Sequence, residues 1–162
     1  MQLSTRGRYA VMALVDLAER QTLGCLCGPI CLAEIAARQQ LSLAYLEQLF
    51  GKLRRAGLVA SARGPGGGYR LARQSDRIAV ADIVAAVDEP IRATRCEHGS
   101  AGCMEGVGAD GGSGRCQTHD LWDELGRQIL YFLEGITLAD VVAGRVVGRA
   151  VKLAEVPPLA AE

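Results

Sequence analysis

A glycine run between two short apolar segments is the feature that most constrains the fold of this chain. Residues 64–68 read Gly-Pro-Gly-Gly-Gly, and the flanking segments 58–62 and 69–71 have the character of short strands. Such a run is typical of a tight turn, because glycine adopts the backbone conformations that tight turns require. The sequence therefore predicts a small β-hairpin over residues 58–71.

Three helical patterns precede this hairpin. The first runs from Ser4 or Thr5, either of which could cap it, to about Gln21. A short second helix over 32–36, a turn over 39–41 and a third helix capped by Ser42 are expected to follow. The predicted buried stripe of the third helix comprises Leu43, Leu46, Phe50 and Leu53. Helix, turn, helix and hairpin in this order predict a mainly α fold with a small β-hairpin wing, a winged helix-turn-helix.

The exposed face of the third helix and the arginines of the wing are candidate contacts to DNA. Exposed side chains of such a helix can reach base edges, and arginines flanking the turn can meet phosphates or, for Arg63, a narrow minor groove. Residues 1–80 carry 11 Lys and Arg against 5 Asp and Glu, whereas residues 81–162 carry 7 against 13. The front half is therefore +6 and suits a polyanion, although scattered solvated charges are the alternative. The candidate contacts are Ser42, Tyr45, Glu47, Gln48, Arg63 and Arg70.

Three cysteines and a histidine gather in a glycine-rich stretch behind the hairpin: Cys96, Cys103, Cys116 and His119. Three thiolates and one imidazole complete a four-coordinate set for zinc or an iron-sulfur cluster. Zinc ligands usually come in tight pairs, so the isolated positions of Cys96 and Cys103 favour a cluster. Incidental thiols in a loop are the alternative.

Cysteine usage also bears on the compartment. Six cysteines without a secretory leader favour a reducing environment, and no apolar run approaches membrane-spanning length. We therefore expect a cytoplasmic protein with no membrane partner.

A second group of cysteines comprises Cys25, Cys27 and Cys31. They could bind another metal or form a redox pair, or they could be small apolar residues of a loop.

A wide apolar stripe at helical spacing follows the candidate ligands. It is too wide for a lone surface helix, and residues 1–80 are expected to close a core of their own. We therefore expect a second subunit to bury the stripe, giving a homodimer on a double-stranded, pseudo-palindromic operator. Packing within one subunit is the alternative. The stripe comprises Leu121, Trp122, Leu125, Ile129, Phe132 and Leu133, and Thr137 is expected to cap a short final helix over 138–142.

Five segments resemble the IscR, NsrR and CymR family of winged helix-turn-helix regulators: STRGRYAVMALVDLA, LSLAYLEQLFGKLRRAGLV, RGPGGGYRLA, IAVADIVAAVDEP and CQTHDLW. The resemblance covers residues 1 to about 146. It implies a homodimeric transcription factor that reports the supply of [2Fe-2S] clusters and controls cluster-assembly genes. It also implies the ligands Cys96, Cys103, Cys116 and His119, and gives Glu47 control over which operators the cluster-free form uses.

The chain departs from the family in a longer insert between Cys103 and Cys116, which makes His98 an alternative ligand. Sensing of nitric oxide or of thiol redox state, and a zinc-bound regulator, are alternatives with the same fold. A scaffold that binds no nucleic acid is a further one. An enzyme is not expected, because no oxyanion-type motif, P-loop or cofactor fingerprint is present.

The predicted organisation has four parts. Residues 1–80 form the winged helix-turn-helix DNA-binding domain, and 81–119 a connecting helix and cluster-binding loop. Residues 120–145 form a long dimerisation helix and a short terminal helix, and 146–162 a disordered tail. Cluster-donating assembly proteins are further candidate partners.

Overall fold

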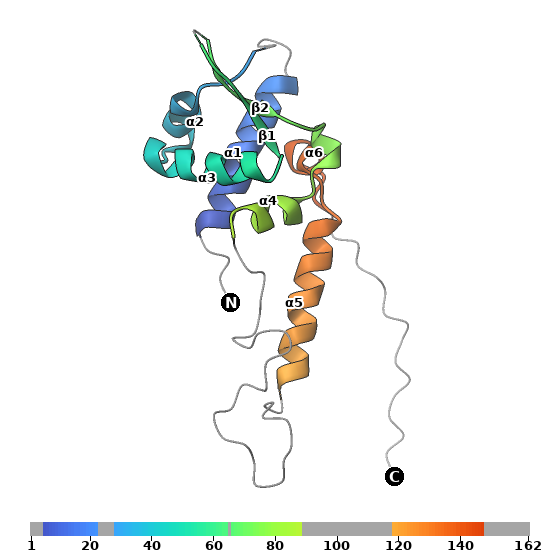
Figure 1. The fold of residues 1–162 in the computed structure, drawn as a ribbon. Coiled ribbons are helices and arrows are strands. Elements are labelled where there is room, and N and C mark those ends of the chain that lie inside the picture. Colours follow the sequence, from blue (N-terminus) through green and yellow to red (C-terminus); the bar gives the residue numbers. More distant parts are fainter. Residues whose placement is uncertain (1–4, 23–27, 65, 89–117, 148–162) are drawn as a thin grey trace, which may run out of the picture.

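Helices and one hairpin make up the chain in the computed structural model, which describes residues 5–22, 28–64, 66–88 and 118–147. The elements are α1 (Thr5–Thr22), α2 (Leu32–Gln39), α3 (Leu43–Arg55), β1 (Val59–Ala62), β2 (Gly68–Leu71), the 3-10 turn η1 (Ser75–Arg77), α4 (Val80–Ala86), α5 (His119–Glu134) and α6 (Leu138–Val142). Figure 1 shows α1 to α4, α6 and the hairpin as one body from which α5 projects. The predicted mainly α fold with a hairpin wing is confirmed. The predicted tail over 146–162 lies almost wholly outside the described residues.

The buried stripe of α3 differs from the expected one at a single position. Leu46, Phe50 and Leu53 are buried as predicted, and Leu49 is buried beside them. Leu43 is 42% exposed, so its predicted burial is wrong. It occupies the first position of the helix, and a helical side chain leans toward the N-terminus, which here carries it past the core.

The hydrophobic core extends beyond residue 80. Ile83 of α4, Val87 directly after this helix and Leu138 of α6 belong to the same buried cluster as residues of α1 to α3. The expectation that residues 1–80 close a core of their own is therefore wrong. Periodicity within each helix cannot show which helices share a core, because that depends on where the chain returns.

A short backbone pairing brings the C-terminal helices back to the core. The Val80 amide donates to the Ile136 carbonyl at 2.9 Å, and the Leu138 amide donates to the Ile78 carbonyl at 2.8 Å. Ala79 and Thr137 face each other in this antiparallel bridge. The pairing and the burial of Leu138 fix the end of α5 and the start of α6 on the N-terminal helices.

Helix α6 begins with the predicted cap. The Asp140 amide donates to the Thr137 hydroxyl at 3.1 Å, and the Thr137 amide donates to the Asp140 carboxylate at 3.1 Å. These reciprocal bonds form a capping box. Hydrogen bonds from the Thr137 hydroxyl and amide lower the pKa of Asp140.

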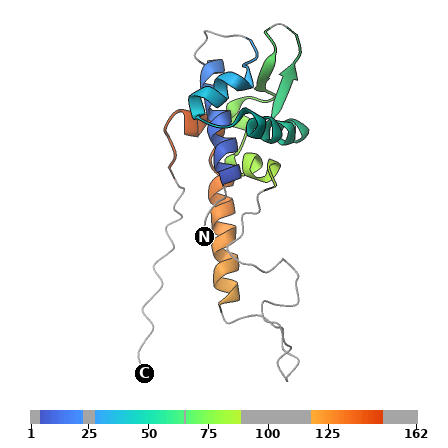
Figure 2. The same ribbon diagram turned by 90° about the vertical axis from the view of Figure 1, so that its left-hand side faces the viewer.

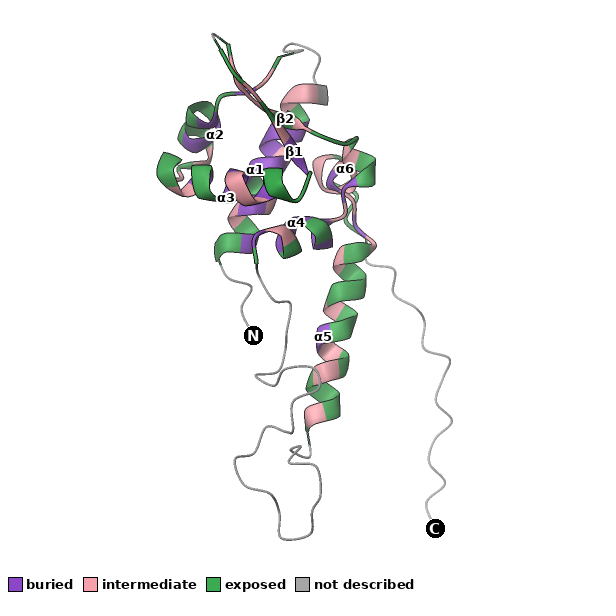
Figure 3. Cartoon of the chain, in the orientation of Figure 1, coloured by how far each residue is buried: buried purple, intermediate pink, exposed green. Residues whose placement is uncertain are grey.

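Helix α5 leaves this junction and extends away from the rest of the described chain (Figures 1 and 2). Several of its large apolar side chains are exposed, and Figure 3 shows little burial along the helix. The most exposed are Leu121 (62%), Tyr131 (60%), Trp122 (44%) and Phe132 (43%). None of the described helices is long and apolar enough to cross a membrane.

One buried carboxylate, Asp16, joins α1 to α2. It accepts hydrogen bonds from the guanidinium of Arg38 and, at 3.0 Å, from the amide of Gln39. Burial raises the pKa of Asp16, but the bonds from Arg38 and Gln39 and the charges of Arg38 and Arg20 outweigh it and hold the pKa below its usual value. The charged pair therefore stabilises the fold at neutral pH.

Replacing Asp16 tests this link. We expect Asp16→Ala to lower the free energy of unfolding by about 2 kcal/mol at pH 7, because it leaves the guanidinium without its buried partner. Because the pKa of Asp16 is lowered in the folded state, its contribution to the free energy of unfolding is lost as the pH falls through that pKa. The stabilities of the wild type and Asp16→Ala should therefore become equal in acid. Urea unfolding at several pH values measures both effects.

The control is Glu34→Ala, which removes only an exposed ion pair to Arg38 at 3.6 Å. This change should lower the free energy of unfolding by less than about 1 kcal/mol. An equal loss in both variants would contradict the account.

Candidate nucleic-acid interface and metal ligands

The turn between α2 and α3 sets the direction of the candidate recognition helix α3. Gln40 adopts a left-handed conformation at φ 53°, and its amide donates to the Ala36 carbonyl. The Leu41 amide donates to the same carbonyl at 3.0 Å. Ser42 follows in the N-cap position, but its side chain makes no capping hydrogen bond. The turn therefore takes three residues, and α3 starts directly after it.

Most of the predicted contacts on α3 lie on its exposed side. Ser42, Glu47 and Gln48 are exposed. Tyr45 was predicted to face solvent, but it is half-buried, and its ring meets the ring of Tyr9 edge-on at 6.1 Å. The reason is that Tyr45 lies on the flank of α3 that packs on α1. Its ring therefore contributes to packing, and part of the side chain remains exposed.

The wing is held near its turn by a third segment of chain. Strands β1 and β2 pair antiparallel, with Ala62 opposite Gly68. Tyr69 exchanges two backbone hydrogen bonds of 2.8 Å with Ile30, just before α2. A Cβ on Gly68 would collide with the backbone of Ile30, so this approach requires glycine. The hairpin projects at one end of the molecule (Figure 2).

The two predicted wing arginines are exposed, Arg70 within β2 and Arg63 directly after β1. Gly64 and Gly66 have φ angles of 103° and 77°, which favour glycine and let the strand reverse close to Arg63. Both guanidinium groups are thus on a hairpin that is anchored to the helix-turn-helix. This arrangement suits contacts with a phosphate backbone.

Of the four predicted metal ligands, the structure describes one. His119 is the first residue of α5 and is half-buried. Cys96, Cys103 and Cys116 lie outside the described residues, as do His98, Cys25 and Cys27. Cys31 is exposed at the N-cap of α2. Within the described ranges no three potential ligands come together.

An ion pair that sequence analysis missed joins α3 to the end of α4. The Lys52 ammonium lies 2.8 Å from the Asp88 carboxylate. The hydrogen bond and charge of Lys52 lower the pKa of Asp88, and the charges of Arg55 and Arg6 add to this. The side chain of Lys52 is 26% exposed. The partners are 36 residues apart, so no local pattern could reveal them.

Together, the helix-turn-helix, the anchored wing with its arginines and the projecting helix define a winged-helix transcriptional regulator. The family model that matches residues 3–144 is Rrf2, described as an iron-dependent transcriptional regulator. The chain belongs to the Rrf2 family. It is an IscR-type regulator, not an enzyme, and it binds DNA.

Relatives and solved structures agree with this assignment. The chain is 51% identical over 142 residues to the HTH-type transcriptional regulator IscR of Aliivibrio salmonicida, covering 88% of this chain and 77% of that protein. It is 50% identical to IscR of Yersinia pestis, covering 88% and 79%. The structure of T. potens IscR matches with a TM-score of 0.66 at 36% identity, covering 89% and 88%. The structure of CymR, the global cysteine regulator of B. subtilis, matches with a TM-score of 0.66 at 32% identity, covering 89% and 98%.

The close approach of Gly68 to Ile30 can be tested directly. We expect Gly68→Ala to lower the free energy of unfolding by about 1–3 kcal/mol, because the added methyl forces Tyr69 away from Ile30. Gly51→Ala is the matched control, since nothing lies within 4 Å of a Cβ at this helical position. It should stabilise the protein by up to about 1 kcal/mol. Thermal unfolding of both variants measures the difference, and a neutral Gly68→Ala would show that the wing does not need this close approach.

Proposed function

We propose that this chain acts in the cytoplasm as a homodimer that senses [2Fe-2S] cluster supply through Cys96, Cys103, Cys116 and His119. Its proposed targets are the operators of iron-sulfur cluster assembly genes, and cluster-donating assembly proteins are its proposed further partners. The observation that carries the proposal is the position of His119. It is the first residue of the helix that connects directly to the DNA-binding body, three positions after Cys116.

The donor set fits such a cluster. Three thiolates and an imidazole supply four ligands, and histidine can replace cysteine as a ligand to iron in a [2Fe-2S] cluster. A histidine donates less charge than a cysteine and can protonate near neutral pH. When bound, the cluster would supply a centre that is gained, lost or reduced more easily than one held by four thiolates. His119 would contribute this sensitivity.

The proposed DNA contacts divide into base-reading and positioning groups. Gln48 can form two hydrogen bonds to adenine, and Glu47 can accept from cytosine but repels edges that carry only acceptors. Glu47 would therefore reject some operators as well as select others. Ser42, the exposed part of Tyr45 and the arginines Arg63 and Arg70 would bind phosphates and fix the register.

The residues between the ligands and α3 offer a continuous physical connection. Helix α5 begins at His119 and ends beside the backbone pairing of Ile136–Leu138 with Ile78–Val80. Leu138 is buried in the same core as Leu46, Leu49 and Leu53 of α3. A change in the position of α5 would therefore alter the packing of the core that supports α3. Cluster binding can shift operator affinity only if it favours one of two such arrangements.

Ligation can be tested by spectroscopy. Protein purified without oxygen should show visible cluster absorption with bound iron and sulfide. We expect His119→Ala and the three single Cys→Ala variants at 96, 103 and 116 to diminish it, because each removes one donor. Cys31→Ala is the matched control and should keep the absorption. A colourless protein with stoichiometric zinc would contradict cluster binding.

The role of Glu47 can be tested with cluster-free protein. We expect Glu47→Ala to let this form bind operators that otherwise require the cluster, because the repelling carboxylate is gone. A mobility-shift titration with operator DNA measures the effect, which should reach about tenfold or more. Unchanged binding of the cluster-free variant would remove the assigned role of Glu47.

A further inference from the structure

A glycine lies in the middle of the outward face of α3. Gly51 follows Gln48 by three positions and precedes Arg55 by four, so the three residues share one face of the helix. Gln48 and Arg55 are exposed. The opposite face is the buried one and carries Leu46, Leu49, Phe50 and Leu53. Gly51 therefore belongs to the face that is proposed to meet DNA.

The fold itself does not require glycine at this position. Glycine is less favourable than alanine inside a helix, because it has more backbone freedom to lose on folding. Gly51 has no positive φ that would call for glycine. Among the described residues, apart from its chain neighbours and the backbone of its own helix, nothing lies within 4 Å of a Cβ at this position. A residue that lowers stability without a packing reason is typical of a functional position.

The basic side chains at the end of α3 are engaged to different degrees. Lys52 pairs with Asp88 at 2.8 Å, and Arg54 donates to the Ser61 hydroxyl at 3.4 Å. Within the part of the chain that the structure describes, the Arg55 side chain forms no hydrogen bond or ion pair of its own, and its charge only adds to that of Lys52 at Asp88. Because Lys52 already compensates Asp88, the guanidinium of Arg55 is available to an anion.

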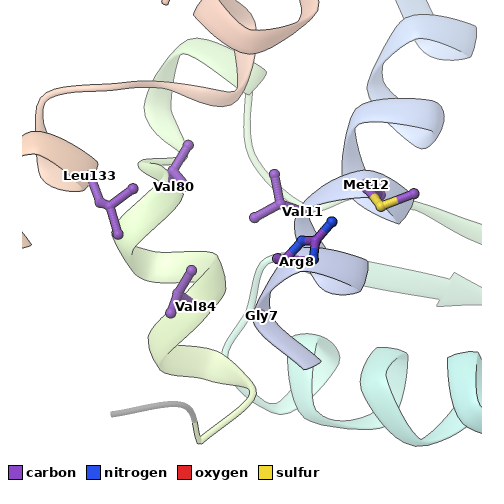
Figure 4. A pocket seen from close by; sticks show the side chains of 7 residues that line it. All are labelled: Gly7, Arg8, Val11, Met12, Val80, Val84 and Leu133. Carbon is purple, nitrogen blue, oxygen red and sulfur yellow. The ribbon is translucent and has the colours of Figure 1, made fainter. Parts of the chain in front are cut away.

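Arg8, in the first turn of α1, is not part of this face. Figure 4 shows it beside an apolar pocket where α1, α4 and α5 meet, which it lines together with Val11 and Val84. Helix α1 meets α3 through a different residue, Tyr9, whose ring contacts that of Tyr45. Arg55 is therefore the basic side chain that belongs with Gly51.

We infer that a sugar-phosphate strand of the operator crosses α3 at Gly51, and that Arg55 binds a phosphate of this strand. The inference rests on the proposed reading of DNA by α3. A helix rises about 1.5 Å per residue, which places Gly51 about 4.5 Å and Arg55 about 10.5 Å beyond Gln48 along the axis. The major groove is about 12 Å wide, so a helix that reads bases at Gln48 meets the strand at the groove edge over this length.

The missing side chain of Gly51 sets how closely this strand approaches. Without a Cβ, the strand can come near the backbone of α3, as at other sites where a ligand passes close to glycine. A side chain at this position would hold the strand away from the helix. The contacts of Gln48 with a base and of Arg55 with a phosphate would then lengthen together.

Substitution of Gly51 separates binding from folding. Full-chain variants are prepared anaerobically like the wild type, and their affinity is measured for a labelled duplex that the wild type selects from a random-sequence pool. We expect Gly51→Ala to raise the temperature of unfolding and yet weaken duplex binding about fivefold or more, because the methyl takes the space of the strand. Gly51→Leu should weaken binding further. A merely structural role would move stability and affinity in the same direction.

The assignment of Arg55 is tested by the salt dependence of the same binding. Loss of one phosphate contact reduces the slope of log affinity against log salt concentration by about one. We expect Arg55→Gln to show this reduction. Arg54→Gln is the matched control, since it removes the same charge from the next residue, whose side chain reaches Ser61. It should keep the wild-type slope.

The outcomes separate this inference from the reading of DNA by α3. Gln48→Ala tests the reading itself and should weaken binding of the selected duplex about tenfold. If it does so while Gly51→Ala binds as tightly as the wild type, or while Arg55→Gln keeps the wild-type slope, the inference is overturned and the reading by α3 stands. If Gln48→Ala also binds like the wild type, the reading by α3 fails and the inference fails with it.

Discussion

The backbone pairing between Ile78–Val80 and Ile136–Leu138 is the interaction on which the rest of the structure depends. Its two hydrogen bonds and the burial of Leu138 attach the C-terminal helices to the core that supports α3. Without it, α5 would lose the backbone bonds that tie its C-terminal end to α4 and keep side-chain packing such as that of Leu133 on Val80 and Val84. With it, the helix that begins at a proposed ligand and the helix proposed to read DNA share one packed unit.

The wing depends on a similar long-range contact. Ile30 lies before α2, yet it exchanges backbone hydrogen bonds with Tyr69 in the hairpin. The ring of Tyr69 in turn meets the ring of Phe50 of α3 at 4.9 Å. The hairpin therefore contacts both the segment before α2 and α3, and these contacts set the position of the wing backbone relative to α3. A defined position serves DNA reading, because the contacts must match the spacing of a groove.

Much of the fold could be predicted from local patterns. Helical periodicity located α1 to α3, the glycine run located the wing, and Thr137 was correctly identified as the cap of α6. The errors concern contacts between distant segments. Leu43 belongs to the apolar pattern but starts its helix beyond the core, and Tyr45, expected to face solvent, packs against Tyr9 of α1. Leu138 shares one core with α3, and Lys52 pairs with Asp88. Both contacts depend on tertiary folding, which helical periodicity does not encode.

Of the candidate site, the exposed positions on α3 and the wing followed from the pattern. The ligand set rests on residue chemistry and resemblance, and three of its four members lie outside the described residues.

The account is tested most directly by the operator affinity of one anaerobic preparation, measured before and after its iron and sulfide are removed. If the ligands at the start of α5 bias the packed unit that reads DNA, the two affinities should differ by about tenfold or more, within the usual range of coupling between sites. Equal affinities, from a sample shown to have contained the cluster and to have lost it, would contradict the central claim.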